Sequence, residues 1–342
     1  MSRRTTINYT GDKVPLVTRA FLAIFGGFLA AFIGFSNIAS AQGKWAQATP
    51  MPTARSEIVA AALDDIIYVV GGLTHQGGLT TFEAFDPATN TWMVLPPIPE
   101  PRHHTAIAAL NGRIYVTGGF GRSGSGFRSH FSTVLNTTWV YDPVLRQWSE
   151  ATPMPGGRAA HAMASVSGKI FVLGGVAGAP QSVWSYNPNT GTWDTTWAPI
   201  PNVREHTSAA ALDGKIYVMG GRWSRGNLNV ASFFDPETNT WTRLPAMPSS
   251  RGGLTAAAVN GRIHVTGGEE LSGGLTFDAH EAFDPVAGTW EILAPLPTAR
   301  HGLASATVNN ILYAIGGATG AGLLTYTTLS DGVEAFALAP SN

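Results

Sequence analysis

The sequence contains no cysteine among its 342 residues. This absence excludes disulfide bonds, metal sites with thiolate ligands and cysteine nucleophiles. Charged residues are also scarce: Asp, Glu, Lys and Arg make up 13% of the chain, which is about half of the usual share. The polar surface must therefore come largely from Thr, Ser, Asn and the backbone.

The first forty residues have the pattern of a secretory signal. Four basic residues precede the uncharged apolar stretch FLAIFGGFLAAFIGF at 21–35, and the small residues ASA follow at 39–41. The apolar stretch is shorter than the roughly 20 residues of a membrane span, and ASA fits a signal-peptidase site. We expect cleavage before Gln42, so that residues 1–41 are a signal peptide and the protein is exported, periplasmic or secreted. The alternative is an uncleaved N-terminal anchor that tethers an outward-facing protein to the membrane.

Removal of residues 1–41 changes the charge of the chain. This segment holds four of the 21 basic residues and one of the 22 acidic ones, so the remainder has a net charge of −4. Such a surface has no general attraction for nucleic acid. We therefore expect no nucleic-acid partner, and membrane contact only through an uncleaved N-terminal segment.

A sequence unit recurs six times in the remainder of the chain. Pairs of glycines fall 46 to 56 residues apart, each after an apolar run such as IIYVVGG or KIYVMGG. In five units an aromatic residue with Asp-Pro or Asn-Pro follows, as in FEAFDP, and then a tryptophan. The glycine pairs lie at 71–72, 118–119, 174–175, 220–221, 267–268 and 316–317. Short apolar strands with regular turn signals indicate a repetitive all-β protein.

The unit resembles the kelch repeat, in which four strands form one blade of a β-propeller. The resemblance covers about residues 43–336, and six copies in register make it specific. A radial arrangement lets each four-stranded sheet cover its neighbour and protects the sheet edges. We predict an all-β fold for residues 42–342, a six-bladed kelch β-propeller.

The last unit predicts how the ring closes. It ends in VEAFALAPSN, without Asp-Pro or tryptophan. Trp45 precedes the first glycine pair by 26 residues, the spacing at which tryptophans precede most of the other pairs. Residues of about 43–48 are therefore expected to complete the last blade as its outer strand.

An arginine lies sixteen residues before every glycine pair. These are Arg55, Arg102, Arg158, Arg204, Arg251 and Arg300. In the kelch architecture this position opens the innermost strand, so the resemblance implies six guanidinium groups around one mouth of the central channel. Six like charges need counter-charge, and guanidinium suits carboxylate or phosphate oxygens. The hypothesis is a ring that binds an anion; alternatively, each arginine bonds to loop carbonyls of its own or the adjacent blade.

Histidines and glutamates gather after these arginines. The candidates for acid–base catalysis are Glu57, Glu205, His104 and His206, and those for ligand binding are His103, His161 and His301. They come from different repeats without short ligand spacing, so we expect no metal and no cofactor. The alternative is that they are hydrogen-bonding or packed residues.

Two loops carry further candidates. The segment RWSRGN places Arg222 and Trp223 together, and an aromatic residue beside arginine suggests a sugar platform. The long loop at 120–136 contains Arg122, Arg128 and His130. This loop is either a lid over the mouth or a tolerated surface insertion.

Three functions remain open from the sequence. The first is an extracytoplasmic binding module that recognises an anionic sugar acid, glycan or peptide at the arginine-ringed mouth. The second is a sugar mutarotase or epimerase, implied by a distant resemblance to exported kelch epimerases of sialic acid. Its carboxylate clamp would be Arg55, Arg102, Arg204 and Arg300. The third is a scaffold for protein–protein adhesion.

Overall fold

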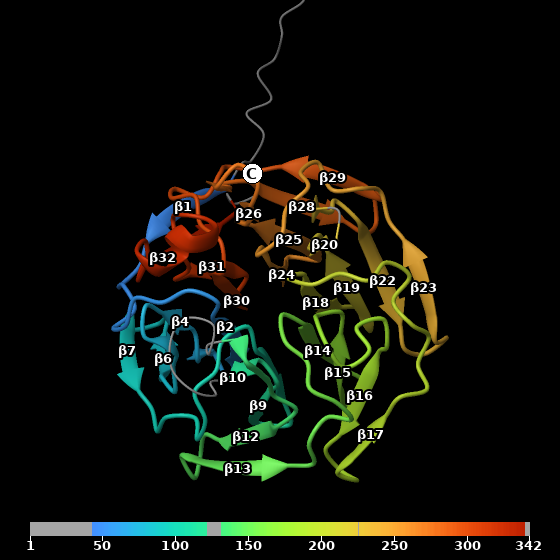
Figure 1. Cartoon of the computed structure of the whole chain (residues 1–342). Coiled ribbons are helices and arrows are strands. Elements are labelled where there is room, and N and C mark those ends of the chain that lie inside the picture. The colour runs from blue at the N-terminus through green and yellow to red at the C-terminus, as the bar shows by residue number, and fades with distance from the viewer. Residues whose placement is uncertain (1–42, 122–130, 225, 339–342) are drawn as a thin grey trace, which may run out of the picture. The chain divides into compact units, whose positions relative to one another are not determined.

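The structure, a computed structural model, describes residues 43–121, 131–224 and 226–338. Its strands form six four-stranded antiparallel sheets, arranged as blades around a central axis (Figure 1). The prediction of an all-β six-bladed propeller is confirmed. Within these ranges no helix is both long and apolar enough to cross a membrane. The expected signal peptide at 1–41 and the residues Arg122, Arg128 and His130 lie outside the described ranges.

Each blade runs from an innermost strand at the axis to an outermost strand at the rim. In that order, blade one consists of β2 (Val59–Leu63), β3 (Ile66–Val70), β6 (Phe82–Asp86) and β7 (Thr91–Val94). Blade two consists of β8 (Ala106–Leu110), β9 (Arg113–Thr117), β12 (Thr138–Asp142) and β13 (Gln147–Ala151). Blade three consists of β14 (Ala162–Val166), β15 (Lys169–Leu173), β16 (Trp184–Asn187) and β17 (Thr192–Asp194). Blade four consists of β18 (Ser208–Leu212), β19 (Lys215–Met219), β22 (Ala231–Asp235) and β23 (Thr240–Arg243). Blade five consists of β24 (Thr255–Val259), β25 (Arg262–Thr266), β28 (His280–Asp284) and β29 (Thr289–Ile292). Blade six consists of β30 (Ala304–Val308), β31 (Ile311–Ile315), β32 (Val333–Ala337) and β1 (Lys44–Gln47).

The connections between the second and third strands of the blades carry small additional elements. Four of them contain short hairpins, and blade six has a 3₁₀ helix, η2 (Gly322–Tyr326), instead. The hairpins are β4 (Leu73–Thr74) with β5 (Gly77–Gly78), β10 (Phe120–Gly121) with β11 (Thr133–Val134), β20 (Arg222–Trp223) with β21 (Gly226–Asn227), and β26 (Glu269–Glu270) with β27 (Leu275–Thr276).

The two ends of the propeller sequence meet in blade six. Strand β1 pairs antiparallel with β32, so that Lys44 lies opposite Ala337 and Gln47 opposite Glu334. Figure 1 shows this blue strand at the rim of the red blade. The predicted closure by residues 43–48 is therefore confirmed.

The outer tryptophan of every blade joins that blade to its neighbour. Each indole N–H donates to a carbonyl oxygen in the loop that leaves the outer strand of the preceding blade, at 2.9 to 3.0 Å. The pairs are Trp92 with Thr49, Trp148 with Pro96, Trp193 with Thr152, Trp241 with Ala198, Trp290 with Pro245, and Trp45 with Ala294. Together they form a closed circuit of hydrogen bonds through all six blades.

The glycine pair allows neighbouring blades to approach closely at the end of the second strand. Gly71 has a φ of +65°, and a Cβ there would lie 2.7 Å from the Arg102 carbonyl oxygen of the next blade. The neighbouring Gly72 N–H donates to that same oxygen at 3.0 Å. Any larger residue at Gly71 would clash with the neighbouring blade and adopt an unfavourable backbone conformation.

Candidate functional site

The six repeated arginines lie inside the blades and do not face a ligand. All six are only 0–1% exposed. Four pair with buried or half-exposed carboxylates: Arg55 with Glu83, Arg102 with Glu100, Arg251 with Glu281, and Arg300 with Glu334. Three of these glutamates lie on the third strand of the same blade.

The remaining two arginines also bond within their own blades through their terminal nitrogens. Arg158 donates to the carbonyl oxygens of Gly178, Ala179 and Ser182, and its guanidinium lies 3.7 Å from the centre of a ring of Trp184. Arg204 donates to the Val230 carbonyl and the Ser232 hydroxyl, both at 2.7 Å.

The predicted anion-binding ring of guanidinium groups is therefore wrong, because these side chains turn into their own blades instead of toward the axis. This correction covers all the arginines named for that ring and for the carboxylate clamp: Arg55, Arg102, Arg158, Arg204, Arg251 and Arg300. The alternative of structural hydrogen bonds within each blade describes what is observed.

The residue two positions after each arginine forms a ring around the channel mouth. All six residues have positive φ angles of 49° to 64°. They are Glu57, His104, Ala160, His206, Gly253 and Gly302. From His104 to Gly302, each of these residues donates its backbone N–H to the carbonyl oxygen of the ring residue in the preceding blade. The ring is closed by the N–H of Ile58, next to Glu57, which donates to the Gly302 carbonyl oxygen. The N–H···O distances are 2.8 to 3.3 Å.

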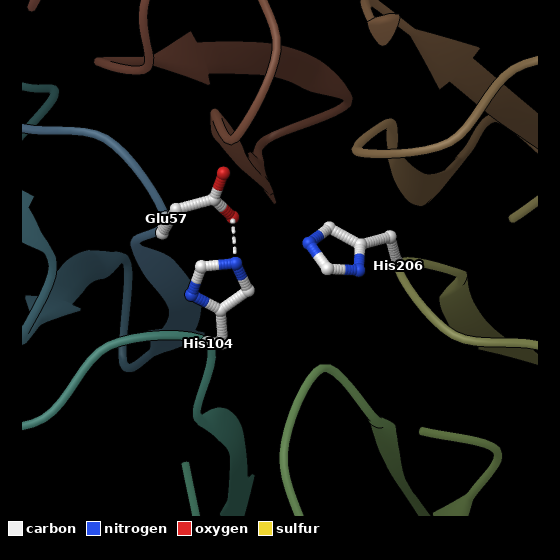
Figure 2. Close-up of side chains that lie close together, drawn as sticks. All are labelled: Glu57, His104 and His206. Atoms are coloured by element: carbon white, nitrogen blue, oxygen red, sulfur yellow. Dashed lines mark ion pairs between the residues drawn. The ribbon is translucent and has the colours of Figure 1, made fainter. Parts of the chain in front are cut away.

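This backbone ring determines which side chains reach the axis. Positive φ is unfavourable for residues other than glycine, and it recurs at functional sites where the surrounding structure enforces it. Blades five and six have glycine at this position and blade three has alanine, which leaves space over the channel. The other three blades place Glu57, His104 and His206 there, and Figure 2 shows these side chains directed toward one another.

These three side chains are close enough to act together. His104 Nε2 lies 3.4 Å from Glu57 Oε2, and the His104 and His206 rings are 4.7 Å apart between centroids. One potential ligand atom from each of the three residues lies within 4.8 Å of the others. All three side chains are largely removed from solvent.

A second set of side chains surrounds His206. Arg222 Nε donates to Glu205 Oε1 at 2.7 Å, and Arg222 Nη1 donates to Glu269 Oε1 at 2.5 Å. Arg222 Nη2 lies 2.9 Å from His206 Nε2, and the Glu205 carboxylate contacts His206 Nδ1. Arg222 and Glu269 occupy the same position in blades four and five, directly after the glycine pair.

His301 completes the arrangement from blade six. Its Nε2 lies 3.1 Å from the Gly320 carbonyl oxygen, which can only accept, so Nε2 donates this hydrogen bond. Its Nδ1 lies 3.6 Å from Glu57 Oε1 and 3.3 Å from Glu269 Oε2. We call Glu57, His104, Glu205, His206, Arg222, Glu269 and His301 the mouth cluster. Its three glutamates outnumber its one arginine.

Burial keeps the histidines of the axis neutral. The pKa of His104 is lowered to about 3, chiefly by desolvation and also by the nearby Arg222 guanidinium and His301. The pKa of His206 is held well below its ordinary value, again chiefly by burial and then by Arg222. Neutral imidazoles beside carboxylates can accept protons, donate hydrogen bonds or bind metal ions.

The cavity at the channel mouth is small. Its volume is about 130 Å³, and it is lined by Glu57, His104 and His206 together with the small residues of the innermost strands. Pockets for drug-sized ligands usually have volumes of roughly 300–1,000 Å³. A ligand larger than an ion or a few waters must therefore extend out of this cavity while it contacts the mouth cluster.

The structure brings together most of the candidates from the sequence, but not all. The four acid–base candidates, Glu57, Glu205, His104 and His206, meet at the mouth with Arg222 and His301. His103 Nδ1 contacts His104 Nδ1 at 2.5 Å behind the cluster. His161 instead bonds to the Thr117 hydroxyl between blades two and three. Trp223 follows Arg222 on β20 and is 39% exposed.

Glu269 is the one member of the mouth cluster that was not among the predicted site residues. Its signal in the sequence is positional: it follows the glycine pair of blade five as Arg222 follows that of blade four. In the other blades this position holds Leu, Phe, Val or Ala. Arg222 and Glu269 are the two charged residues at a position that is apolar in the other four blades. This break in the repeat marks both as candidate site residues.

Acid should destabilise this protein steeply. Burial lowers the pKa of five histidines, to about 3 for His104, His161 and His280, to about 4 for His264, and well below the ordinary value for His206. In the unfolded chain histidine titrates near pH ~6.5, so below that pH the unfolded state binds more protons and stability falls as the pH falls. Each group contributes up to about 1.4 kcal/mol per pH unit between about pH 6.5 and 4. Urea unfolding midpoints across this range measure the loss.

His264→Tyr should flatten this pH dependence, because it removes one of the buried histidines. The variant should fold, since tyrosine occupies the equivalent second-strand position in four other blades. The matched control is His75→Gln, since His75 is exposed in the loop between β4 and β5. It should leave the profile unchanged. A urea midpoint that stayed constant in wild type down to about pH 4 would contradict the neutral, buried state of these histidines.

The fold and its repeat define the class: a kelch β-propeller, which is a general binding-module fold. A family model described as the KLHDC2/KLHL20/DRC7 Kelch-repeats domain matches residues 16–175 and 151–317. Because this match covers most of the sequence, the chain belongs to the kelch-repeat family.

Two kinds of similar protein accompany this family match. Kelch-like protein 36 of Mus musculus and that of Rattus norvegicus are each 27% identical to this chain over 217 residues, 60% of this chain and 34% of each relative. The chain thus spans about a third of the length of these curated relatives. The solved structure titled "Structure of YjhT" has a TM-score of 0.70 and 21% identity, and the match covers 84% of this chain and 96% of that one. This likeness shows the fold alone.

Proposed function

We propose that this chain is an exported kelch binding protein that takes a small hydroxyl-rich ligand, of the sugar class, at the mouth cluster. The observation that carries the proposal is the backbone ring at the channel mouth. Three of its six positions hold Glu57, His104 and His206 at positive φ, where the equivalent positions of other blades hold glycine or alanine. Such a backbone conformation for functional side chains is typical of binding and catalytic sites.

The charge of the mouth cluster favours a neutral or cationic ligand over the anion expected from the sequence. The one arginine of the cluster, Arg222, is already paired with Glu205 and Glu269. Carboxylates accept hydrogen bonds from hydroxyl groups, and a neutral imidazole can both donate and accept. A sugar presents several hydroxyl groups that match this set, whereas a sugar acid would bring another carboxylate to a cluster in which three glutamates face one arginine.

Export is part of the proposal and is supported by the sequence of residues 1–41. The basic residues, the short apolar stretch and the ASA segment at 39–41 together match a secretory signal. We place the propeller in the periplasm or outside the cell. An uncleaved N-terminal segment would leave it tethered and facing outward.

The geometry also favours a second candidate function, sugar mutarotation. Glu57 lies beside His104, and Glu205 contacts His206 from the other side of the mouth. Ring opening of a sugar needs one group that removes the proton of the anomeric hydroxyl and another that protonates the ring oxygen. Neutral imidazoles can remove the proton, but the general acid would have to acquire its proton at the mouth.

The ligand can be found by saturation-transfer NMR with neutral sugars, amino sugars, uronates and sialic acid, with EDTA present. We expect neutral or amino sugars to bind, and Glu57→Gln to weaken this binding by about 10- to 100-fold, because it removes a hydrogen bond to a charged group. Glu237→Gln is the control, since Glu237 is exposed in an outer turn of blade four. Exchange spectroscopy of the two anomers in the same samples tests mutarotation.

Two results would overturn this assignment. If uronates or sialic acid bind more tightly than all neutral and amino sugars, the charge argument is wrong. If no sugar binds to the folded wild-type chain, the protein-adhesion function, which uses other surfaces of the propeller, becomes the better explanation.

A further inference from the structure

We infer that the mouth cluster also binds a divalent transition metal ion, for which Zn²⁺ is the best match, through Glu57, His104 and His206. This inference goes beyond sugar binding and does not depend on it. It replaces the expectation from the sequence, where the absence of short ligand spacing argued against a metal. The spacing argument considers only ligands close in sequence, whereas the backbone ring brings together residues that are 47 and 102 positions apart.

The distances are close to those of a coordination shell. Zn²⁺ binds imidazole nitrogen and carboxylate oxygen at about 2.0–2.2 Å, so two ligand atoms of a tetrahedral site lie about 3.3–3.5 Å apart. His104 Nε2 and Glu57 Oε2 are 3.4 Å apart, which is long for a hydrogen bond but fits this separation. The ligand atoms of all three residues lie within 4.8 Å of one another. His206 Nε2 is the third ligand, and it has to exchange its contact with Arg222 Nη2 for the metal ion.

The electrostatics favour a cation of charge two. The mouth cluster has three carboxylates and one guanidinium, and this excess of carboxylates attracts a divalent cation placed next to Glu57. Arg222 remains paired with Glu205 and Glu269, and only its contact from Nη2 to His206 Nε2 would have to open.

The surroundings of two proposed ligands resemble a second coordination shell. The Glu205 carboxylate lies next to Nδ1 of His206 without a hydrogen bond between them, and Nδ1 of His104 contacts His103. Metal-binding histidines usually bond through their other nitrogen to a carboxylate or another polar group, which fixes their orientation.

The test uses the exported chain, residues 42–342, freed of metal with EDTA and then titrated with ZnCl₂ without any sugar. Calorimetry and elemental analysis should give one Zn²⁺ per chain, and Co²⁺ should give the intense visible bands of a four- or five-coordinate site. The double variant His104→Gln/His206→Gln should lose this stoichiometric binding, and Glu205→Gln should weaken it by about 10- to 100-fold. His75→Gln, in an exposed loop, is the control for adventitious surface binding.

Circular dichroism and thermal melting establish that each variant is folded. Absence of Zn²⁺ binding by the folded wild type would overturn the inference, and so would binding that survives in the His104→Gln/His206→Gln variant. Sugar binding is measured in EDTA and metal binding without sugar, so either proposal can fail while the other stands.

Discussion

A chain that begins at Thr49 and therefore lacks strand β1 should lose stability on the order of 5 kcal/mol, or fail to fold. Deletion removes Trp45, whose indole packs on Phe336 and His280 and donates to Ala294 of blade five. Truncation of a large packed aromatic residue alone costs about 3–5 kcal/mol. The deletion also exposes the whole edge of β32. Since the net stability of a domain is only about 5–15 kcal/mol, the loss should be visible as a large drop in melting temperature.

A matched variant separates closure of the ring from loss of one aromatic contact. Trp193→Ala removes the equivalent indole bond, from blade three to Thr152 in blade two, but leaves every strand of the ring in place. It should be less destabilising than the deletion. Equal melting temperatures for the full and shortened chains would show that β1 is not needed to close the propeller.

The second large effect concerns the buried arginines. Arg300→Met should destabilise the fold by about 3–5 kcal/mol, because it leaves the Glu334 carboxylate buried without its counter-charge. Arg300→Met/Glu334→Leu should regain most of this loss, since apolar replacement of a buried ion pair is often neutral or stabilising. Chemical denaturation of wild type and both variants measures the difference.

Arg204→Met is the control for the charge. In the described part of the chain Arg204 pairs with no carboxylate; its partners are the Val230 carbonyl and the Ser232 hydroxyl. The expected loss is therefore smaller, about 1–3 kcal/mol for groups left without a donor. If Arg300→Met were as stable as wild type and bound anionic ligands more weakly, the arginine would have a binding role that the structure does not give it.

The architecture could be predicted because it depends on patterns that repeat. Glycine pairs, apolar runs and the aromatic-Asp-Pro turn each occur at a fixed place in the unit, so each copy supports the others. The closing strand could be found from Trp45 alone, since its spacing to the next glycine pair matched the other tryptophans. Both predictions use local geometry and the need of each sheet to be covered.

The direction of the arginine side chains could not be read from their spacing. A position at the start of an inner strand is compatible with a side chain at the axis or inside the blade. The sequence does contain a hint of the second arrangement: FEAFD, HEAFD and VEAFA place Glu83, Glu281 and Glu334 at one common position of the third strand. A carboxylate that recurs on a buried strand indicates a buried cation, and the same three blades pair it with their arginine.

The site was only partly predictable for a related reason. The sequence indicated that His104, His206 and Glu57 lie at one level of the propeller, because they have the same offset from their arginines. It did not indicate that this offset has positive φ and a closed circuit of backbone hydrogen bonds, which directs those side chains to the axis. His161 lies one residue further along, and this shift turns it toward Thr117 instead.

The most direct test of the mouth cluster as the recognition site is a calorimetric titration with the best-binding sugar from the NMR panel. Three proteins are compared: wild type, Glu57→Gln at the mouth and Glu237→Gln at the rim. We predict that Glu237→Gln binds as wild type does, and that Glu57→Gln binds about 10- to 100-fold more weakly with an unchanged melting temperature. Equal affinities of wild type and folded Glu57→Gln would contradict recognition at the mouth.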